Sequence, residues 1–77
     1  MIVSTRRAER WLLEHGFVEL PGNGSGHRQF KNEHTGHKIM VRGHGRPELD
    51  PWAVGNFMKA VRTAGFDPRD VRRDLGI

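Results

Sequence analysis

The sequence predicts a small α+β fold, in which a three-stranded antiparallel sheet carries helices on one of its faces. Two observations predict this fold. Apolar residues recur at helical spacing near the N-terminus and again in the second half of the chain. Between these two stretches lie three short segments with the alternation and the flanking turn residues of strands. A chain of 77 residues is expected to form one domain with a modest core, spanning residues 1–77.

The first helix is expected from about Thr5 to His15. Ser4 is a good N-cap for it, because its hydroxyl can accept a hydrogen bond from a free N–H of the first turn. Gly16 is expected to end the helix, because glycine adopts the left-handed conformation at little cost. The apolar face of this helix consists of Ala8, Trp11, Leu12 and His15.

Three strands are expected next, over Phe17–Leu20, His27–Asn32 and His37–Arg42. The segment 33–36 between the last two has the length and the glycine of a hairpin connection. Because side chains alternate between the two faces of a strand, the anchors that point to the core are Phe30, Ile39 and Val41, and Arg28 shares their side. The opposite, open face of the hairpin is then expected to carry His27, Lys31, Lys38 and Arg42.

Two helices are expected to complete the fold, after a loop over residues 43–49. Asp50-Pro51 predicts the start of a long helix that ends before Gly65, with Asp as N-cap and Pro at the first helical position. Asp67-Pro68 repeats this signal and predicts a short last helix from Arg69 to about Leu75, so that residues 67–77 form a C-terminal helical extension. Double-stranded-RNA-binding domains share the order of the first five elements, helix, three strands and helix.

Charge and composition narrow the range of functions. The chain has 13 Lys and Arg against 9 Asp and Glu, a net charge of +4, which favours a nucleic-acid partner over an acidic small substrate. A surface charge that only confers solubility is the alternative. Since the chain lacks cysteine, disulfides and thiolate metal sites are excluded. No apolar run has the length of a membrane span or the form of a signal peptide, so we expect a cytoplasmic protein without membrane contact.

Four patches of the sequence, in register along the chain, carry a more specific signal. They are Leu12-Leu13-Glu14-His15-Gly16-Phe17, Gly24-Ser25-Gly26-His27 followed by Phe30, Val41 with His44, Glu48 and Leu49, and Phe57 through Phe66. Together these patches resemble the HicA family of bacterial toxins, which are small mRNA interferases with a double-stranded-RNA-binding-domain-like fold. The chain departs from the family pattern at Arg42, where the family usually has Pro, and in residues 67–77, which extend beyond the usual C-terminus.

The resemblance implies that His27 is the catalytic residue of an endoribonuclease that cleaves single-stranded mRNA. When the 2′-OH of RNA attacks the neighbouring phosphate, the reaction needs a proton acceptor and nearby positive charge. A neutral imidazole supplies the acceptor, so neither a metal nor another cofactor is expected, and DNA is rejected because it lacks the 2′-OH. An ordinary surface histidine is the alternative for His27. The residues expected to contact RNA are Gly24, Ser25, Gly26, Arg28, Lys31, Lys38, Arg42 and His44. For His44, a general acid on the 5′-oxygen and an ordinary exposed loop histidine are the alternatives.

The resemblance also implies a partner, an antitoxin of the HicB kind, which should be acidic where it covers the basic face. Alone, the chain is expected to be a monomer. Two other functions stay open: an RNA-binding module of the same fold without catalysis, and a protein whose basic face meets DNA or another polyanion. His34 and His37 are interpreted as solvated hairpin residues, because a zinc site needs three or four protein ligands. Trp52 is interpreted as a cover for the edge of the core, with stacking on a base or on a partner as the alternatives.

Overall fold

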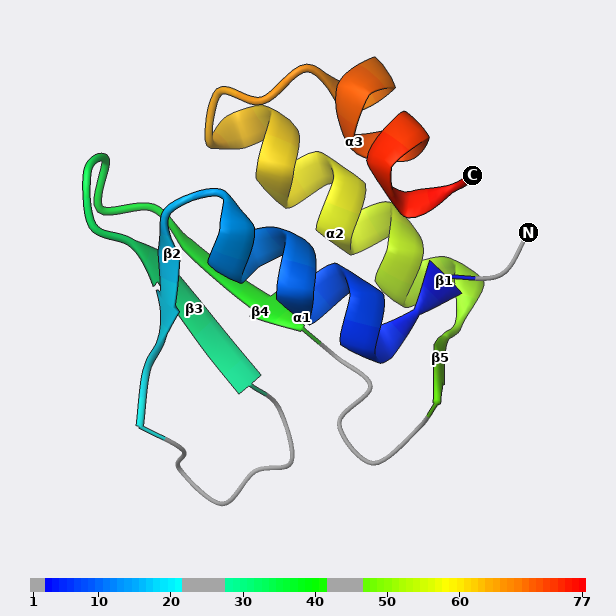
Figure 1. The fold of residues 1–77 in the computed structure, drawn as a ribbon, viewed down its shortest axis with the longest axis horizontal. Coiled ribbons are helices and arrows are strands. Elements are labelled where there is room, and N and C mark those ends of the chain that lie inside the picture. Colours follow the sequence, from blue (N-terminus) through cyan, green and yellow to red (C-terminus); the bar gives the residue numbers. More distant parts are fainter. Residues whose placement is uncertain (1–2, 22–27, 42–46) are drawn as a thin grey trace.

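The computed structural model describes residues 3–21, 28–41 and 47–77. It confirms the predicted α+β fold, with a three-stranded antiparallel sheet in the order β2–β3–β4 and three helices. The two longer helices each pack against the sheet, and the third contacts both of them (Figure 1). The sheet consists of β2 (Phe17–Glu19), β3 (Arg28–Asn32) and β4 (Lys38–Val41), and the helices are α1 (Thr5–Glu14), α2 (Pro51–Thr63) and α3 (Pro68–Leu75).

The register of the strands confirms which side chains face the core. Phe30 of β3 is the Cα partner of Ile39 on β4, and both are buried, as is Val41. The loop between the two strands is a hairpin turn in which Gly36 has a φ of 79°. Asn32 holds this turn, because its side-chain oxygen accepts the backbone N–H groups of His34 and Thr35 at 2.8 and 3.1 Å. The period-2 alternation thus predicted the core-facing side chains correctly, and it did the same for Lys31 and Lys38 on the open face. His27 and Arg42, the other two residues predicted there, lie outside the described residues.

One continuous core joins the sheet to all three helices. Its members include Trp11 and Leu12 of α1, Phe57 of α2, and Val71 and Leu75 of α3. Val71 is fully buried and Leu75 is 4% exposed, so the last helix contributes apolar side chains to the same cluster as the other elements. The N-caps Ser4, Asp50 and Asp67 all accept a backbone N–H of their helix, as the sequence predicts.

The structure corrects the prediction of a loop over residues 43–49. Within that range, Glu48–Leu49 forms a short strand, β5, which pairs antiparallel with β1, Val3–Ser4. The physical reason is burial: Val3 and Leu49 are 1% and 6% exposed, and backbone groups that enter the core need hydrogen-bond partners. Strands of two residues are too short to show alternation in the sequence.

Trp52 also differs from its interpretation. Trp52 lies in the first turn of α2 and is 62% exposed, so it does not cover the edge of the core. None of the described helices combines the length and the apolar character that crossing a membrane requires.

Candidate functional site

The predicted site residues divide into two groups. Arg28, Lys31 and Lys38 belong to the part of the chain that the structure describes. The remaining predicted site residues lie outside the described residues; these are Gly24, Ser25, Gly26, His27, Arg42 and His44. The described part of the predicted site therefore consists of these three residues and the sheet that carries them.

Lys31 and Lys38 sit directly opposite each other on the open face of the sheet. They are Cα partners in the β3–β4 ladder, and both are exposed. The Asn32 N–H donates to the His37 carbonyl at 2.8 Å, so the adjacent pair, Lys31 and Lys38, is of the non-hydrogen-bonded kind. Cα atoms of such pairs are about 4.5 Å apart, closer than those of hydrogen-bonded pairs.

Two like charges in this position repel each other, and cross-strand pairs of this kind destabilise a sheet. No ion pair among the described residues involves either lysine. No carboxylate among the described residues therefore neutralises the two ammonium groups. A polyanion bound to this face would offset the repulsion, which makes the pair a suitable phosphate contact.

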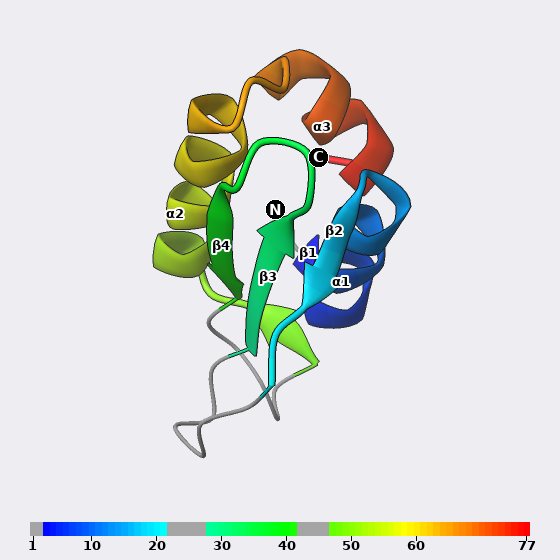
Figure 2. The same cartoon turned by 90° about the vertical axis from the view of Figure 1, so that its left-hand side faces the viewer.

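The rest of the open face is mixed in character. In Figure 2 the strands face the viewer and no described helix lies in front of them. Val18 is the β2 partner of Lys31 and is 39% exposed. Gln29 and Met40, which are Cα partners on β3 and β4, are half-buried on the same face. The face therefore offers both cations and apolar surface. This combination suits a single-stranded nucleic acid, whose phosphates can meet the cations and whose bases can meet the apolar surface.

Arg28 lies on the other face, as the alternation predicts, and its charge is already engaged. One guanidinium nitrogen, Nη1, is 3.3 Å from Oε1 of Glu9 on α1, and Nε is 3.5 Å from Oε2 of Glu19 on β2. The Glu9 side chain is only 13% exposed. Arg28 therefore ties the start of β3 to both α1 and β2, immediately after His27 in the sequence. Sequence reasoning missed Glu9 and Glu19, because neither is close to Arg28 along the chain.

Two of the described histidines, His15 and His37, have local partners for their rings. Nδ1 of His37 is 2.9 Å from the Thr35 hydroxyl, within the same turn. His15 stacks on Trp11, with ring centroids 3.9 Å apart, and its Nδ1 lies 2.7 Å from the Trp11 carbonyl. Since a carbonyl only accepts, Nδ1 of His15 carries the hydrogen. Among the described residues, no group of three or more His, Cys, Asp or Glu side chains is placed to hold a metal ion.

Comparison with protein families gives a match over most of the chain. Residues 5–66 match the family described as the HicA toxin of bacterial toxin–antitoxin systems. The chain belongs to the HicA toxin family. It is therefore a toxin of a toxin–antitoxin system and has a cognate antitoxin as its partner. Comparisons with curated proteins and with solved structures found no match.

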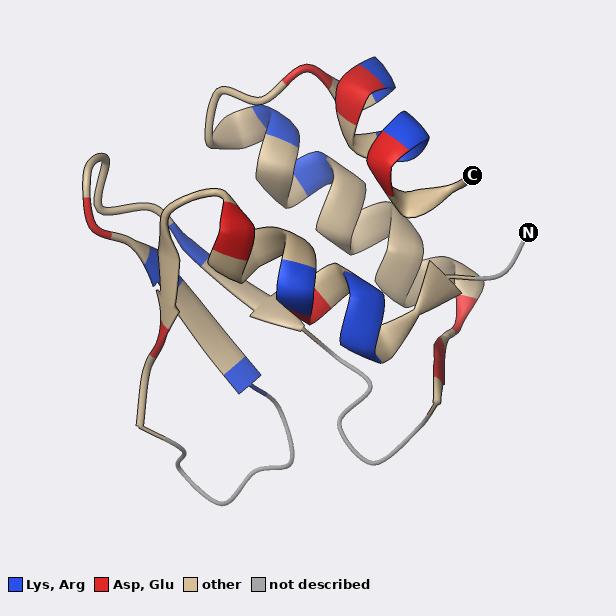
Figure 3. Cartoon of the chain, in the orientation of Figure 1, with Lys and Arg blue, Asp and Glu red and all other residues tan. Residues whose placement is uncertain are grey.

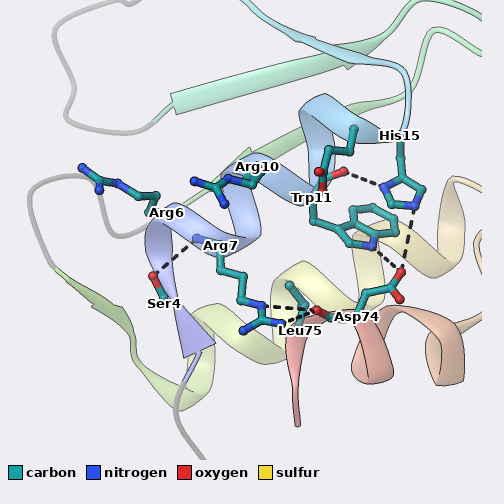
Figure 4. Close-up of a pocket in the computed structure, with 9 residues that line it drawn as sticks. Ser4, Arg6, Arg7, Arg10, Trp11, His15, Asp74 and Leu75 are labelled. Carbon is teal, nitrogen blue, oxygen red and sulfur yellow. Dashed lines mark hydrogen bonds and ion pairs between the residues drawn. The ribbon is translucent and has the colours of Figure 1, made fainter.

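The HicA match ends at residue 66, and α3 begins only at Pro68. This helix forms one wall of a groove of about 860 Å³, whose other wall is α1. Figure 3 shows Lys and Arg on both helices, and Figure 4 shows the side chains that line the groove. The polar ones include Arg6, Arg7, Arg10, Glu14 and Asp74. Six of its nine lining residues lie within the family match, on α1 and at its end, and two, Asp74 and Leu75, belong to α3.

Proposed function

We propose that this HicA-family toxin is an mRNA interferase, an endoribonuclease that cleaves single-stranded mRNA without a metal, and that His27 is its general base. The observation that carries the proposal is the family match over residues 5–66, which includes the Gly24-Ser25-Gly26-His27 segment. The exposed pair of Lys31 and Lys38 supports it, because an enzyme acting on RNA needs cations near the phosphates.

The chemistry assigns one role to each group. The imidazole of His27 takes the proton of a 2′-OH while that oxygen attacks the adjacent phosphorus. The bond from phosphorus to the 5′-oxygen breaks, leaving a 2′,3′-cyclic phosphate on one fragment and a 5′-hydroxyl on the other. The 5′-oxygen receives its proton from His44 or from water.

Phosphate contacts in this scheme come from the open face of the sheet and from the glycine turn. Lys31, Lys38 and Arg42 bind the negatively charged phosphates of the RNA, and backbone N–H groups from Gly24 to Gly26 donate to a phosphoryl oxygen. Arg28 contributes a phosphate contact only in competition with Glu9 and Glu19, which already hold its guanidinium.

The proposal is tested by incubating the purified chain with a single-stranded mRNA in excess EDTA. We expect the parent to cleave, His27→Ala to lose about 100-fold or more of the rate, and DNA of the same sequence to stay intact. His34→Ala is the matched control, because this exposed hairpin histidine has no role in the scheme. Equal cleavage by the parent and His27→Ala, or none by either, would refute catalysis by His27. In cells, growth arrest on induction should disappear with His27→Ala.

A second candidate is an RNA-binding module without catalysis. The pair of Lys31 and Lys38 favours it, because this pair can hold a polyanion whether or not His27 transfers a proton. Binding of RNA without cleavage by the parent would select this function. Equal affinity for DNA and RNA would instead indicate a general polyanion-binding protein.

We also propose where the toxin works and what restrains it. Its substrate, mRNA, places it in the cytoplasm, as a monomer when it is not bound to its partner. The antitoxin is of the HicB kind, and its acidic surface covers the open face and blocks access to His27. Addition of such an antitoxin should stop cleavage in the assay above.

A further inference from the structure

The two helices that line the groove, α1 and α3, are joined by a set of polar contacts centred on Asp74. Arg7 donates from Nε and Nη2 to the backbone oxygen of Asp74, at 3.2 and 3.0 Å. The indole N–H of Trp11 donates to Oδ2 of the same residue at 3.0 Å, and Nε2 of His15 lies 4.0 Å from that oxygen. These contacts fix the two helices relative to each other, so the groove is formed before any partner binds.

Two arginines of the groove have no such role. Arg6 and Arg10 are one helical turn apart on α1, both are exposed, and neither side chain takes part in a hydrogen bond or ion pair between described residues. In Figure 4 both side chains extend away from α3, whereas Arg7 turns toward it. The groove therefore presents two cations at its rim that are available to a ligand.

We propose that this groove binds an acidic segment of the cognate antitoxin, with carboxylates paired to Arg6 and Arg10. A guanidinium can bind a carboxylate through two parallel hydrogen bonds, so two arginines in a row select a segment with acidic side chains at matching positions. Trp11 and Leu75 also line the groove but are each only 4% exposed, so recognition of a partner there rests mainly on charge.

The charges in the groove favour a protein over RNA as the occupant. Glu14 and Asp74 line the same groove as the arginines. A phosphate backbone carries a negative charge at every nucleotide and would meet these carboxylates with repulsion. A protein segment, in contrast, can place its carboxylates at Arg6 and Arg10 and a donor or a cation opposite Glu14.

The position of the groove separates it from the proposed RNA site. It lies among the helices, while the open face with Lys31 and Lys38 is on the side of the sheet away from them (Figures 1 and 2). An antitoxin could therefore engage both surfaces at once, and two linked contacts bind more tightly than either alone. Because α3 lies beyond the family match, the groove would also restrict pairing to antitoxins that carry a complementary segment.

The test compares two double variants of the full chain that change charge equally. Arg6→Glu/Arg10→Gln alters the groove, and Lys59→Glu/Arg62→Gln alters two exposed cations of α2 that do not line it. Binding of the purified cognate antitoxin and of a single-stranded RNA is measured by titration for each. Glu at position 6 is in the first turn of α1, where the helix dipole favours an anion, so the groove variant should stay folded. Arg6→Gln/Arg10→Gln serves as a milder second variant.

We expect the groove variants to weaken antitoxin binding by about tenfold or more, while the control stays within about threefold. RNA binding should change little in any of them. Unchanged antitoxin binding would overturn the proposal, and so would an equal loss in the groove variant and the control. Loss of RNA binding with intact antitoxin binding would make RNA the occupant instead. Antitoxin binding at the groove does not depend on the proposed RNA cleavage, so the absence of nuclease activity would not contradict it.

Discussion

The substitution Leu75→Ala tests whether α3 is part of the folded core, even though the family match ends before this helix. The residue is 4% exposed and belongs to the same apolar cluster as Trp11 and Phe57. Replacing a buried leucine by alanine costs about 2–5 kcal/mol, from lost burial and the cavity left behind. At roughly 0.05–0.15 kcal/mol per residue, the whole chain has about 4–12 kcal/mol of stability. Leu75→Ala should therefore remove a large share of the free energy of unfolding.

The loss is measured by urea and thermal unfolding followed by circular dichroism. One kcal/mol corresponds to about 4–8 °C in a domain of this size, so we expect the Tm to fall by about 8 °C or more. Leu13→Ala is the matched control, because it makes the same change on a helix where the residue is 54% exposed. Its effect should stay within about 0.5 kcal/mol. If the two substitutions cost the same, the packing of α3 described above is refuted.

Three further substitutions give expected outcomes. Asp74→Ala leaves the indole N–H of the buried Trp11 without its acceptor, so the free energy of unfolding should fall by about 1–3 kcal/mol in urea. Lys31→Gln removes the cross-strand repulsion and should stabilise the fold by a few tenths of a kcal/mol. The same change should weaken RNA binding and lower its salt dependence by about one ion. The backbone N–H of Arg69 lowers the pKa of Asp67 below its usual 3.8, so the stability that this carboxylate adds is present above that pH and is lost as the pH falls through the lowered pKa. Asp67→Asn keeps the capping oxygen but cannot titrate, so its free energy of unfolding should depend less on pH between 6 and 2.

Two of the three substitutions have a control within the chain. Asp70→Ala removes an exposed carboxylate of α3 that has no contact with Trp11, and it should cost less than Asp74→Ala. Lys59→Gln removes an exposed cation from α2 and should leave both RNA binding and its salt dependence unchanged. An acid unfolding profile of Asp67→Asn that matches the parent would mean that the carboxylate does not support α3 through its charge.

The parts of the fold that the sequence predicts are those set by neighbouring residues. The N-caps at Ser4, Asp50 and Asp67 and the left-handed glycine at Gly16, with a φ of 87°, follow from local backbone chemistry. The alternation that turns Phe30 inward also turns Lys31 outward, because successive side chains of a strand point to opposite faces. The predicted open face is confirmed for this reason at Lys31 and Lys38, and its other two residues, His27 and Arg42, lie outside the described residues.

The contacts that escaped prediction join residues that are far apart in the chain. β1 and β5 pair across more than forty residues, between Val3 and Leu49, and two residues show no period. Arg28 meets Glu9, 19 residues away, and Trp11 meets Asp74 across 63 residues. No local pattern predicts such contacts, since they depend on how the elements pack.

The sequence alone established the α+β class, the cationic side of the hairpin and the residues that resemble the HicA family. Those conclusions rest on periodicity, caps and short motifs, which act over a few residues. Only the tertiary structure set Lys31 opposite Lys38 in the ladder, engaged Arg28 with two carboxylates, and turned α1 and α3 into the walls of a groove. These arrangements depend on strand register and helix packing, because the distance between two charges is decided by the whole fold.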